Sequence, residues 1–379
     1  MKEKKKTLKV EKAIKARKKR KKRRIKRIGL LVGELLLFVI LAGAAVVVTK
    51  YGKFQKVTID EDDVGINDGI EDVEGYTTVV LFGGDSREGQ LGAGTHADTM
   101  IVVSIDNQTR ELRMASIYRD TLLQQKNMQY HKANNAYFRG GPEEALLLLN
   151  KNLDLNLTDY VTVDFKALVD VVDLLGGIDL DVSQAEIDNI NDYLEETAEV
   201  AGTETEFLKK PGKQHLDGAQ TVTYARIRST GGGDYERTER QREVVETLLN
   251  KILKTDLKTI NKIIDKVFSR VSTSYSLNEI LQLASGVSKI KIGDTTGFPF
   301  EVDDSQTYEN AGSVVIPIGL DKNVEHLHQF LYPNEKKEGV SETVQQISDE
   351  ISFITGVVRP PEMDEKKKDS EEGEEIIVN

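Results

Sequence analysis

"TTVVLFGGDSREGQLGAGTHADTMIVVSID", residues 77–106, contains two strand-like runs, TTVVLF and TMIVVSI, joined by a loop with five glycines. Runs rich in Val, Ile, Thr and Phe that are bounded by glycine-rich turns predict β-strands. An aspartate stands at each edge of the loop, because Asp85 follows the first run and Asp98 precedes the second. If the strands are neighbours, both carboxylates reach one point and could hold Mg²⁺. A turn residue and a strand-start cap are the ordinary alternative uses of the two aspartates.

Strand-like and helix-like segments alternate through the middle of the chain, which predicts an α/β fold. We expect α-β-α layers, with a central mixed β-sheet flanked by helices. The predicted strands are 77–82, 99–106, 111–118, 160–164 and 221–228, with a last strand pair near 299–318. The predicted helices are 142–153, 164–175, 235–254, 257–271 and 276–286, with a partly helical charged insert at 184–209. Asp164 is the expected cap of the second helix, and the stretch "KPGKQHLDGAQ" is expected to turn into the strand 221–228.

The amino-terminal region differs sharply in composition from the rest of the chain. Residues 1–27 hold 17 Lys and Arg against two Glu, and residues 28–49 are apolar apart from Glu34. An apolar run of this length predicts a single transmembrane helix. The basic block before it predicts a cytoplasmic N-terminus and an extracytoplasmic remainder at the cell membrane. A cleaved signal peptide is the competing interpretation, although its apolar core is usually about 7–15 residues long.

The predicted organisation follows from these shifts in composition. A basic cytoplasmic tail (1–27) and the transmembrane helix (28–49) precede an acidic linker (50–76), a domain at 77–332 and a charged extension at 333–379 that is expected to be disordered from 359. The whole chain carries a net charge of −11 although its first 27 residues carry +15. The acidic remainder argues against a nucleic-acid partner and favours the membrane as partner of the basic block. Cysteine is absent, which excludes disulfides and thiolate sites.

Arginines in two later segments suggest a site for an anion with several oxygens. In "TVTYARIRS", residues 221–229, strand alternation would place Arg226 and Arg228 on one face, roughly 7 Å apart. In the helix predicted at 235–254, Arg237 and Gln241 fall on the apolar stripe near the positive amino-terminal end. Arg240 falls off that stripe, so we expect Arg240 and Arg242 on a solvated face.

The end of the strand 111–118 adds a further arginine, Arg119, which is followed by Asp120. His96 and His131 are too isolated to predict a metal triad, and the chain lacks the G-x-S-x-G signature of a serine nucleophile. Two carboxylates and several inward-facing arginines together predict a site for a divalent cation and a polyphosphate.

The chain resembles the LytR-CpsA-Psr family of bacterial cell-envelope proteins. The resemblance rests on seven motifs in this order: "LFGGDSREG", "ADTMIVVSID", "ASIYRDT", "KANNAYFRGGPEEA", "VDLLGGIDLDV", "HLDGAQTVTYARIR" and "ERTERQ". It covers roughly residues 77–255 and the α/β remainder to about residue 332. It implies a phosphotransferase that moves an anionic glycopolymer, such as wall teichoic acid or capsule, from an undecaprenyl-pyrophosphate carrier to peptidoglycan during cell wall biogenesis.

The resemblance also implies roles for individual residues. Asp85 and Asp98 would hold Mg²⁺, with Mn²⁺ as the alternative ion, and one of them would act as the general base. Together with Arg119 they form the expected catalytic set. The residues expected to bind the pyrophosphate are Arg119, Arg226, Arg228, Arg237 and Gln241. Arg87 and His96 are the expected accessory residues, and His96 stands where many relatives carry arginine. The polyprenyl tail is expected in an apolar tunnel.

Two other functions remain open from the sequence. A polyprenyl-pyrophosphate hydrolase would use the same site with water as the acceptor. A membrane-bound transcription attenuator is a role long attached to the family by name, but only 27 residues precede the apolar run, which is too few for a DNA-reading domain.

Overall fold

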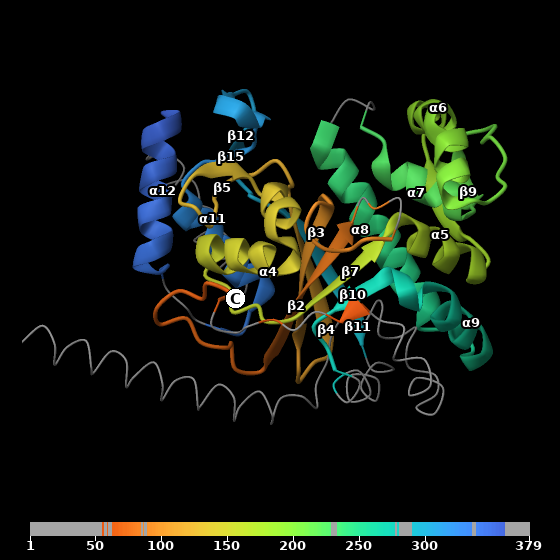
Figure 1. Ribbon diagram of the computed structural model, residues 1–379, viewed down its shortest axis with the longest axis horizontal. Coiled ribbons are helices and arrows are strands. Elements are labelled where there is room, and N and C mark those ends of the chain that lie inside the picture. Colours follow the sequence, from red (N-terminus) through yellow and green to blue (C-terminus); the bar gives the residue numbers. More distant parts are fainter. Residues whose placement is uncertain are drawn as a thin grey trace, which may run out of the picture.

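The computed structural model describes residues 55–56, 59, 63–84, 86, 89–228, 233–276, 279, 290–335 and 339–360 (Figure 1). At its centre is a seven-stranded mixed sheet in the order β1-β10-β7-β2-β3-β4-β11. The strands of this sheet are β1 Gln55–Lys56, β2 Tyr76–Gly84, β3 Ala97–Asp106, β4 Glu111–Ile117, β7 Tyr160–Asp164, β10 Val271–Thr273 and β11 Lys291–Phe298. The predicted α/β class with a central mixed sheet is confirmed.

The remaining elements are short strand pairs and helices around this sheet. The short pairs are β5 Leu122–Gln124 with β6 Tyr130–Lys132, β8 Ile178–Val182 with β9 Gly212–Leu216, β12 Val302–Asp303 with β15 Ile316–Pro317, and β13 Thr307–Tyr308 with β14 Gly312–Ser313. The helices are α4 Asn134–Leu153, α5 Phe165–Leu174, α6 Gln184–Ala201, α7 Gly218–Arg226, α8 Gly233–Ile252, α9 Leu257–Val267, α11 Leu320–Leu331 and α12 Glu342–Thr355, with short 3-10 turns η2 Phe268–Arg270 and η4 Glu309–Ala311.

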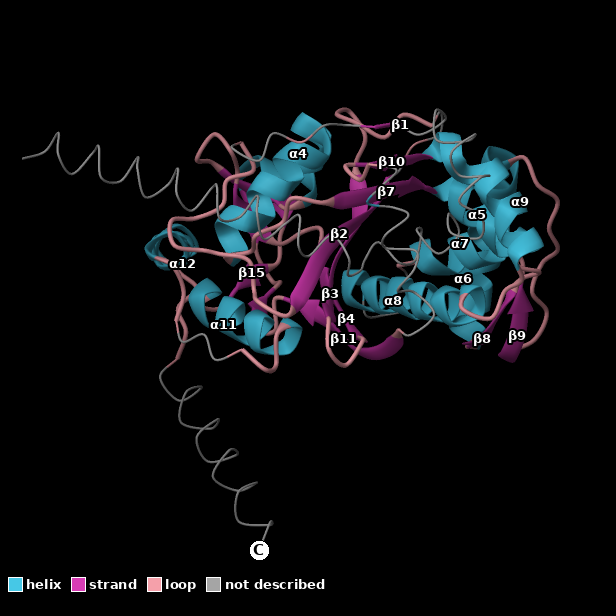
Figure 2. Ribbon diagram, turned by 90° about the horizontal axis from the view of Figure 1, so that it is seen from below, coloured by secondary structure: helices cyan, strands magenta, loops and turns pink. Residues whose placement is uncertain are grey.

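Both faces of the sheet are buried, because side chains alternate along each central strand. In β2, Val79 and Leu81 face one hydrophobic core, which α5 to α9 cover. Val80 and Phe82 face a second core, which α4, α11 and α12 cover. Figures 1 and 2 show these two groups of helices on opposite sides of the sheet. The burial of both faces explains why the central strands are nearly continuous apolar runs.

The two strands predicted in the opening stretch are neighbours and form an antiparallel hairpin. Val80 pairs with Val102, and Gly84, the last residue of β2, pairs with Ala97, the first residue of β3. A parallel pairing of β2 with β7 places Gly84 opposite Asp164. The two edges of the glycine-rich loop therefore meet at one end of the sheet, next to the start of α5.

The predicted strand at 221–228 is wrong, because residues 218–226 form helix α7. A capping box begins this helix: the Asp217 side chain accepts from the backbone N–H of Gln220, and the Gln220 side chain accepts from the backbone N–H of Asp217. The buried hydroxyl of Thr223 donates a hydrogen bond to the backbone carbonyl of Ala219, one turn earlier in the helix, at 2.7 Å. Local capping and burial therefore override the strand preference of the β-branched residues.

The helix and strand boundaries elsewhere are close to those predicted, with a few differences. Asp164 caps α5 by accepting from the backbone N–H of Ala167, as predicted. The helix predicted at 257–271 ends at Val267, and residues 271–273 enter the sheet as β10. Strand β11 was not predicted, and only short pairs form within 299–318. The helix predicted at 276–286 lies almost entirely outside the described residues.

The predicted tail (1–27) and transmembrane helix (28–49) also lie outside the described residues, as does the end of the extension from residue 361. None of the helices in the described ranges combines the length and apolar character that a membrane span requires.

Helix α4 starts at Asn134, eight residues before the predicted start, and it contains a break at Gly141. Gly141 has φ 68° and ψ −154°, a region that is essentially reserved for glycine. A Cβ atom at Gly141 would lie 3.2 Å from the backbone nitrogen of Ala93, in the loop between β2 and β3. The break therefore lets α4 approach the loop that leads to Asp98.

We predict that Gly141→Ala lowers the free energy of unfolding by about 2 kcal/mol or more, because alanine is strained in this conformation and meets the loop backbone. Gly356→Ala is the matched control, since Gly356 has φ 72° and ψ 5° with no atom within 4 Å of an added Cβ. It should cost about 1 kcal/mol. Urea unfolding of both variants measures the difference, and equal losses would contradict the close approach of α4 to the loop.

Candidate active site

Asp98 and Arg119 form the centre of the candidate site. The antiparallel register of β3 and β4 pairs Ile101 with Ser116, and its continuation places Asp98 opposite Arg119. The Arg119 Nη1 donates to the Asp98 Oδ1 at 2.8 Å. Both side chains are largely covered, with exposed fractions of 16% for Arg119 and 20% for Asp98. Sheet register therefore brings together a strand start and a strand end that are 21 residues apart in the sequence.

A second carboxylate orients Arg119 from the other side. The Asp120 Oδ2 lies 3.6 Å from the Nε of Arg119. The Nζ of Lys132, in β6, lies 2.9 Å from the other Asp120 oxygen. The Arg119 guanidinium is thus held between two carboxylates, which limits its side-chain freedom before any ligand binds.

Two more arginines reach Asp98 from the α7–α8 region. The Nη2 of Arg228, just after α7, lies 3.8 Å from the Asp98 Oδ2. Arg237 in α8 is only 2% exposed. Burial tends to raise the pKa of Asp98, but the charges of Arg119, Arg237 and Arg228 and the hydrogen bond from Arg119 outweigh it, so the pKa lies below its ordinary value. Asp98 is therefore an ionised carboxylate surrounded by guanidinium groups.

The amino-terminal part of α8 places Arg237 and Gln241 inward, as its periodicity predicts. Gln241 is 8% exposed, and its Nε2 lies 3.4 Å from the carbonyl of Ala225 in α7. The partial positive charge of the helix end adds to that of the arginines. This region suits an anion that carries several oxygens.

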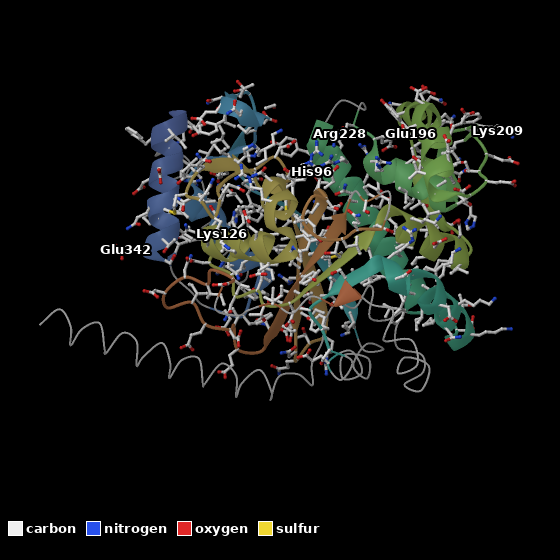
Figure 3. The ribbon with its side chains drawn as sticks, in the orientation of Figure 1. His96, Lys126, Glu196, Lys209, Arg228 and Glu342 are labelled. Atoms are coloured by element: carbon white, nitrogen blue, oxygen red, sulfur yellow. The ribbon has the colours of Figure 1, made fainter. Side chains whose placement is uncertain are left out.

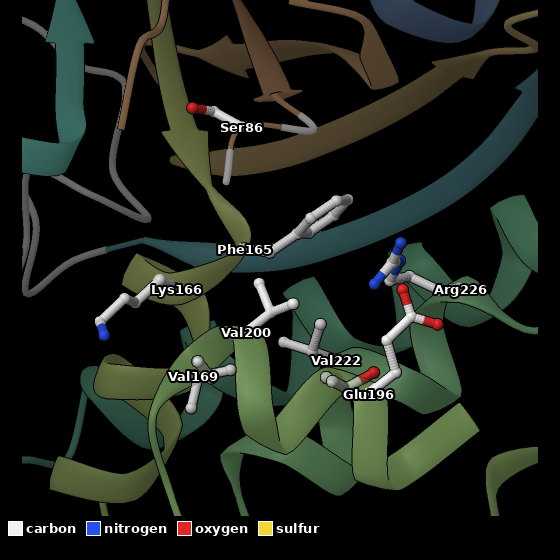
Figure 4. A pocket seen from close by; sticks show the side chains of 10 residues that line it. Ser86, Phe165, Lys166, Val169, Glu196, Val200, Val222 and Arg226 are labelled. Atoms are coloured by element: carbon white, nitrogen blue, oxygen red, sulfur yellow. The ribbon is translucent and has the colours of Figure 1, made fainter. Parts of the chain in front are cut away.

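Arg226 and Arg228 do not share a strand face, contrary to the prediction from strand alternation, and they have different partners. Arg226 is the last residue of α7, and its guanidinium carbon lies 4.6 Å from the centroid of the Phe165 ring. It lines a cavity of about 20 Å³ with apolar residues of α5, α6 and α7. Figure 4 shows the Glu196 carboxylate pointing toward Arg226 in this cavity. Because α7 ends at Arg226 and the backbone is extended at Ile227, the strand alternation that would place both side chains on one face does not apply.

The prediction that Arg240 is solvated is wrong, since this residue is only 4% exposed. Its Nη2 donates to the carbonyl of Ile227 at 2.6 Å, and its Nη1 lies 3.4 Å from carboxylate oxygens of Glu186 and Glu236. Helices α6 and α7 cover the flank of α8 that carries Arg240, which the periodicity of α8 alone does not show. Arg240 therefore fixes the backbone between Arg226 and Arg228.

The prediction that Arg242 is solvated is also wrong, because this residue is half-buried. Burial lowers the pKa of Arg242, while the charges of Tyr118 and Glu239 tend to raise it.

We predict that Arg240→Ala lowers the free energy of unfolding by about 2 kcal/mol, because it removes a charged donor from a buried carbonyl and leaves Glu186 without its cation. Arg139→Ala, at an exposed position of α4, is the control and should lie within about 0.5 kcal/mol of the wild type. Denaturant unfolding measures both, and a wild-type midpoint for Arg240→Ala would refute the supporting role.

The other predicted residues lie at or near the loop between β2 and β3. Asp85 and Arg87 lie outside the described residues, although Gly84, the preceding described residue, pairs with Ala97 beside Asp98. His96 is exposed, and its ring stacks on Phe138 of α4 with a centroid distance of 4.4 Å and an interplanar angle of 12°. Figure 3 shows His96 and Arg228 at the same end of the sheet.

The residues around Asp98 suit Mg²⁺ only together with an anion. The Asp98 Oδ1 accepts from Arg119, and the Oδ2, which lies 3.8 Å from the Arg228 Nη2, is the carboxylate oxygen with the weaker contact and would be the ligand. The described residues hold no group of three or more His, Cys, Asp or Glu side chains arranged for a metal. Three guanidinium groups around one carboxylate repel a cation, and phosphate oxygens would both reverse this repulsion and complete the octahedral ligand set that Mg²⁺ prefers.

We predict that the wild type and Asp98→Asn differ less in their free energy of unfolding as the pH falls. A lowered folded-state pKa stabilises the fold above the ordinary value of 3.8 and loses this effect as the pH falls through the folded pKa. Unfolding at pH 3 and pH 6 and a ¹³C titration of the Asp98 carboxyl measure this. Asp192→Asn, on the exposed side of α6, controls for loss of charge. A titration midpoint above 3.8 would contradict the arginine cluster.

Comparison with known proteins adds the family. The LytR_cpsA_psr family profile matches residues 42–323, about three quarters of the chain. The chain belongs to this family. The expectation from the seven motifs is therefore confirmed.

Two curated relatives show the range of functions described for such proteins. The chain is 32% identical over 177 residues to the polyisoprenyl-teichoic acid–peptidoglycan teichoic acid transferase TagV of Bacillus subtilis, covering 46% of this chain and 43% of TagV. It is 29% identical over 217 residues to Biofilm regulatory protein A of Streptococcus mutans, covering 54% of this chain and 51% of that protein. The matches thus span about half the length of these relatives.

Two solved structures share the fold. A Streptococcus agalactiae protein, gbs0355, aligns with a TM-score of 0.60 and 25% identity, over 71% of this chain and 91% of that chain. TagT of Bacillus subtilis with bound octaprenyl pyrophosphate lipid aligns with a TM-score of 0.50 and 17% identity, over 79% of this chain and 100% of that chain. At this identity the likeness to TagT concerns the fold alone.

Proposed function

We propose that this protein is a Mg²⁺-dependent phosphotransferase that moves an anionic glycopolymer, such as wall teichoic acid or capsule, from an undecaprenyl-pyrophosphate carrier to peptidoglycan. The observation that carries the proposal is the convergence of Arg119, Arg228 and Arg237 on the ionised Asp98. Together with Lys132, these three cations exceed the charge of the two carboxylates, Asp98 and Asp120. The surplus suits a pyrophosphate, whose oxygens accept several charge-assisted hydrogen bonds. Family membership and the similarity to the transferase TagV support the same class of substrate.

The proposed step needs no protein nucleophile. A hydroxyl oxygen of the acceptor glycan bonds to the phosphorus that carries the glycopolymer, and the bridging P–O bond breaks to release polyprenyl phosphate. The hydroxyl proton passes to a carboxylate. Mg²⁺, when bound, would neutralise phosphate charge, and Asp98 together with Asp85 is its proposed ligand set. Arg119, Arg228 and Arg237 would stabilise the charge that develops on the phosphoryl oxygens.

The surroundings of Asp98 bear on which aspartate accepts the proton. A general base works best when its pKa lies near the working pH. The pKa of Asp98 is instead held below its ordinary value by three arginines, and its Oδ1 is bonded to Arg119. Asp98 is therefore better suited to orient Arg119 and to ligate the cation, and we assign the role of base to Asp85.

The cavity beside Arg226 is the proposed entry for the polyprenyl tail. Phe165, Val169, Val200 and Val222 give it an apolar wall. Its volume of about 20 Å³ holds little more than one water molecule. Helices α5, α6 and α7 would therefore have to separate to admit a lipid. The octaprenyl pyrophosphate lipid bound to TagT, which shares the fold, supports a lipid-linked donor.

The proposed location is the cell membrane, with the apolar run 28–49 as a single span and the domain outside the cytoplasm. The basic block before this run and the extracellular position of peptidoglycan support it.

We predict that the full chain with Mg²⁺, a polyprenyl-pyrophosphate-linked glycan and soluble muramic-acid-containing oligomers forms a glycan–phosphate–glycan linkage. Arg228→Ala should lower turnover about 100-fold, because it removes one charged donor from the phosphoryl group. Its side chain is 47% exposed, so the fold should remain intact. Lys262→Ala, an exposed change in α9, is the control. Mass spectrometry of the product measures the linkage.

Omission of the acceptor separates the alternatives. Release of free glycan phosphate at the full rate without acceptor would identify a hydrolase and reject the transferase. A folded, carrier-binding protein that forms no linkage would also reject it. The same incubation with Mg²⁺ chelated tests the cation, since undiminished turnover would exclude the metal role of Asp98.

A further inference from the structure

A second, much wider cavity lies beside the candidate site, on the neighbouring flank of α8. Its volume is about 600 Å³, which is within the range of small-molecule sites. The amino-terminal end of α6, the Tyr224 side of α7, the outer flank of α8 and Thr295 of β11 form its walls. Arg237 and Gln241 of α8 are buried on its inner side, whereas the residues one position before them, Glu236 and Arg240, line this cleft.

The cleft is lined by charged hydrogen-bonding groups, which are five glutamates and two arginines. Arg240 is occupied by its bonds to Ile227, Glu186 and Glu236. Glu243 accepts the hydroxyl of Tyr224 at 2.6 Å. Glu239 and Glu246 make no ion pair or hydrogen bond to another side chain of the described ranges. They are the acceptors available to a ligand.

Arg242 supplies an independent indication of a ligand. It lines the cleft, and its Nε and Nη1 are buried without a hydrogen-bond partner in the described parts of the chain. Burial lowers its pKa, and the opposing charges of Tyr118 and Glu239 do not offset this effect. Buried donors of a charged group are costly to leave unpaired. A ligand that brings an amide or carboxylate oxygen would remove this cost.

The cleft adjoins the centre of the candidate active site. Tyr118, the residue before Arg119, packs edge-on against Tyr235 of α8 with a centroid distance of 4.8 Å. Arg240 spans the boundary, because it lines the cleft and also bonds to the backbone between Arg226 and Arg228. Only one turn of α8 therefore separates the acidic cleft from the arginine cluster.

We propose that this cleft binds the acceptor in transfer, as a hydroxyl-rich glycan that carries no phosphate. This inference rests on the proposed transferase function. Carboxylates of Glu239 and Glu246 would accept hydrogen bonds from sugar hydroxyls, and Arg242 would donate to an acetamido or carboxylate oxygen. The excess of glutamates repels the anionic polymer of the donor. Donor and acceptor are thereby sorted between two adjoining sites of opposite charge.

The test uses the double variant Glu239→Gln/Glu246→Gln, which keeps side-chain size and removes two charges. Glu195→Gln/Glu199→Gln is the matched control, because both residues are exposed on α6 and line neither cavity. Calorimetry with the full chain in detergent measures the Kd of un-cross-linked peptidoglycan glycan oligomers freed of stem peptides. Turnover gives the acceptor and donor KM separately, and inorganic pyrophosphate binding reports on the arginine cluster.

The cleft variant should raise the glycan Kd and the acceptor KM at least tenfold. Pyrophosphate affinity, donor KM and the melting temperature should stay near wild type, and the control should match wild type throughout. Unchanged glycan affinity in the cleft variant, or no glycan binding by the wild type, would overturn the proposal. A third outcome is that the wild type binds the glycan but transfers nothing, and that the cleft variant does not bind the glycan. This outcome would reject the transferase function and keep the cleft as a glycan site.

Discussion

The ion pair between Asp98 and Arg119 connects the sheet to the candidate site. It forms because antiparallel register sets the first residues of β3 opposite the residues that follow β4. Both side chains are mostly covered, so water screens their interaction weakly. The pair neutralises one charge in a region where two further guanidinium groups gather. Without the carboxylate, those cations would repel one another in a partly buried space, and the cluster would be costly to hold.

The positions of Arg228 and Arg237 depend on the connection between α7 and α8. Arg228 leaves the end of α7, and Arg237 enters from the start of α8. Arg240 bonds to the carbonyl of Ile227 and to two glutamates, so it holds the backbone that carries Arg228. The buried Arg240 thus supports the backbone that carries the more exposed Arg228. This arrangement fixes the position from which the Arg228 side chain reaches the site.

Helix α8 separates two environments of opposite charge. Arg237 acts on the ionised Asp98 and Gln241 is buried against α7, while Glu236, Glu239 and Glu243 line the wide cleft. Successive residues of a helix point about 100° apart, so one short sequence, "ERTERQRE", can line both sites. An enzyme that must keep a polyanionic donor apart from its acceptor gains selectivity from such a wall. The arrangement needs no movement to distinguish the two substrates.

Local patterns predicted most of the elements that carry the site. The two β-branched, apolar runs in 77–106 were sufficient for the two strands and for the edges of their loop, and the period of α8 was sufficient for the burial of Arg237 and Gln241. The α7 error was avoidable, since Asp217 and Gln220 have the spacing of a capping box. The β-branched run at 221–223 favoured a strand, and propensity alone does not weigh a cap against a strand preference.

The sequence by itself determined the α/β class, the strand that begins beside Asp98, the inward side of α8 and the family, because these depend on local periodicity and ordered motifs. Only the tertiary structure decided that Arg226 and Arg228 have different partners, that Arg240 is buried, and that a cleft of about 600 Å³ lies along the outer flank of α8. The physical reason is that each of these depends on which neighbour covers a given flank of a helix. The periodicity of α8 does not show that α6 and the end of α7 contact its Arg240 flank, because those contacts form only in the folded chain.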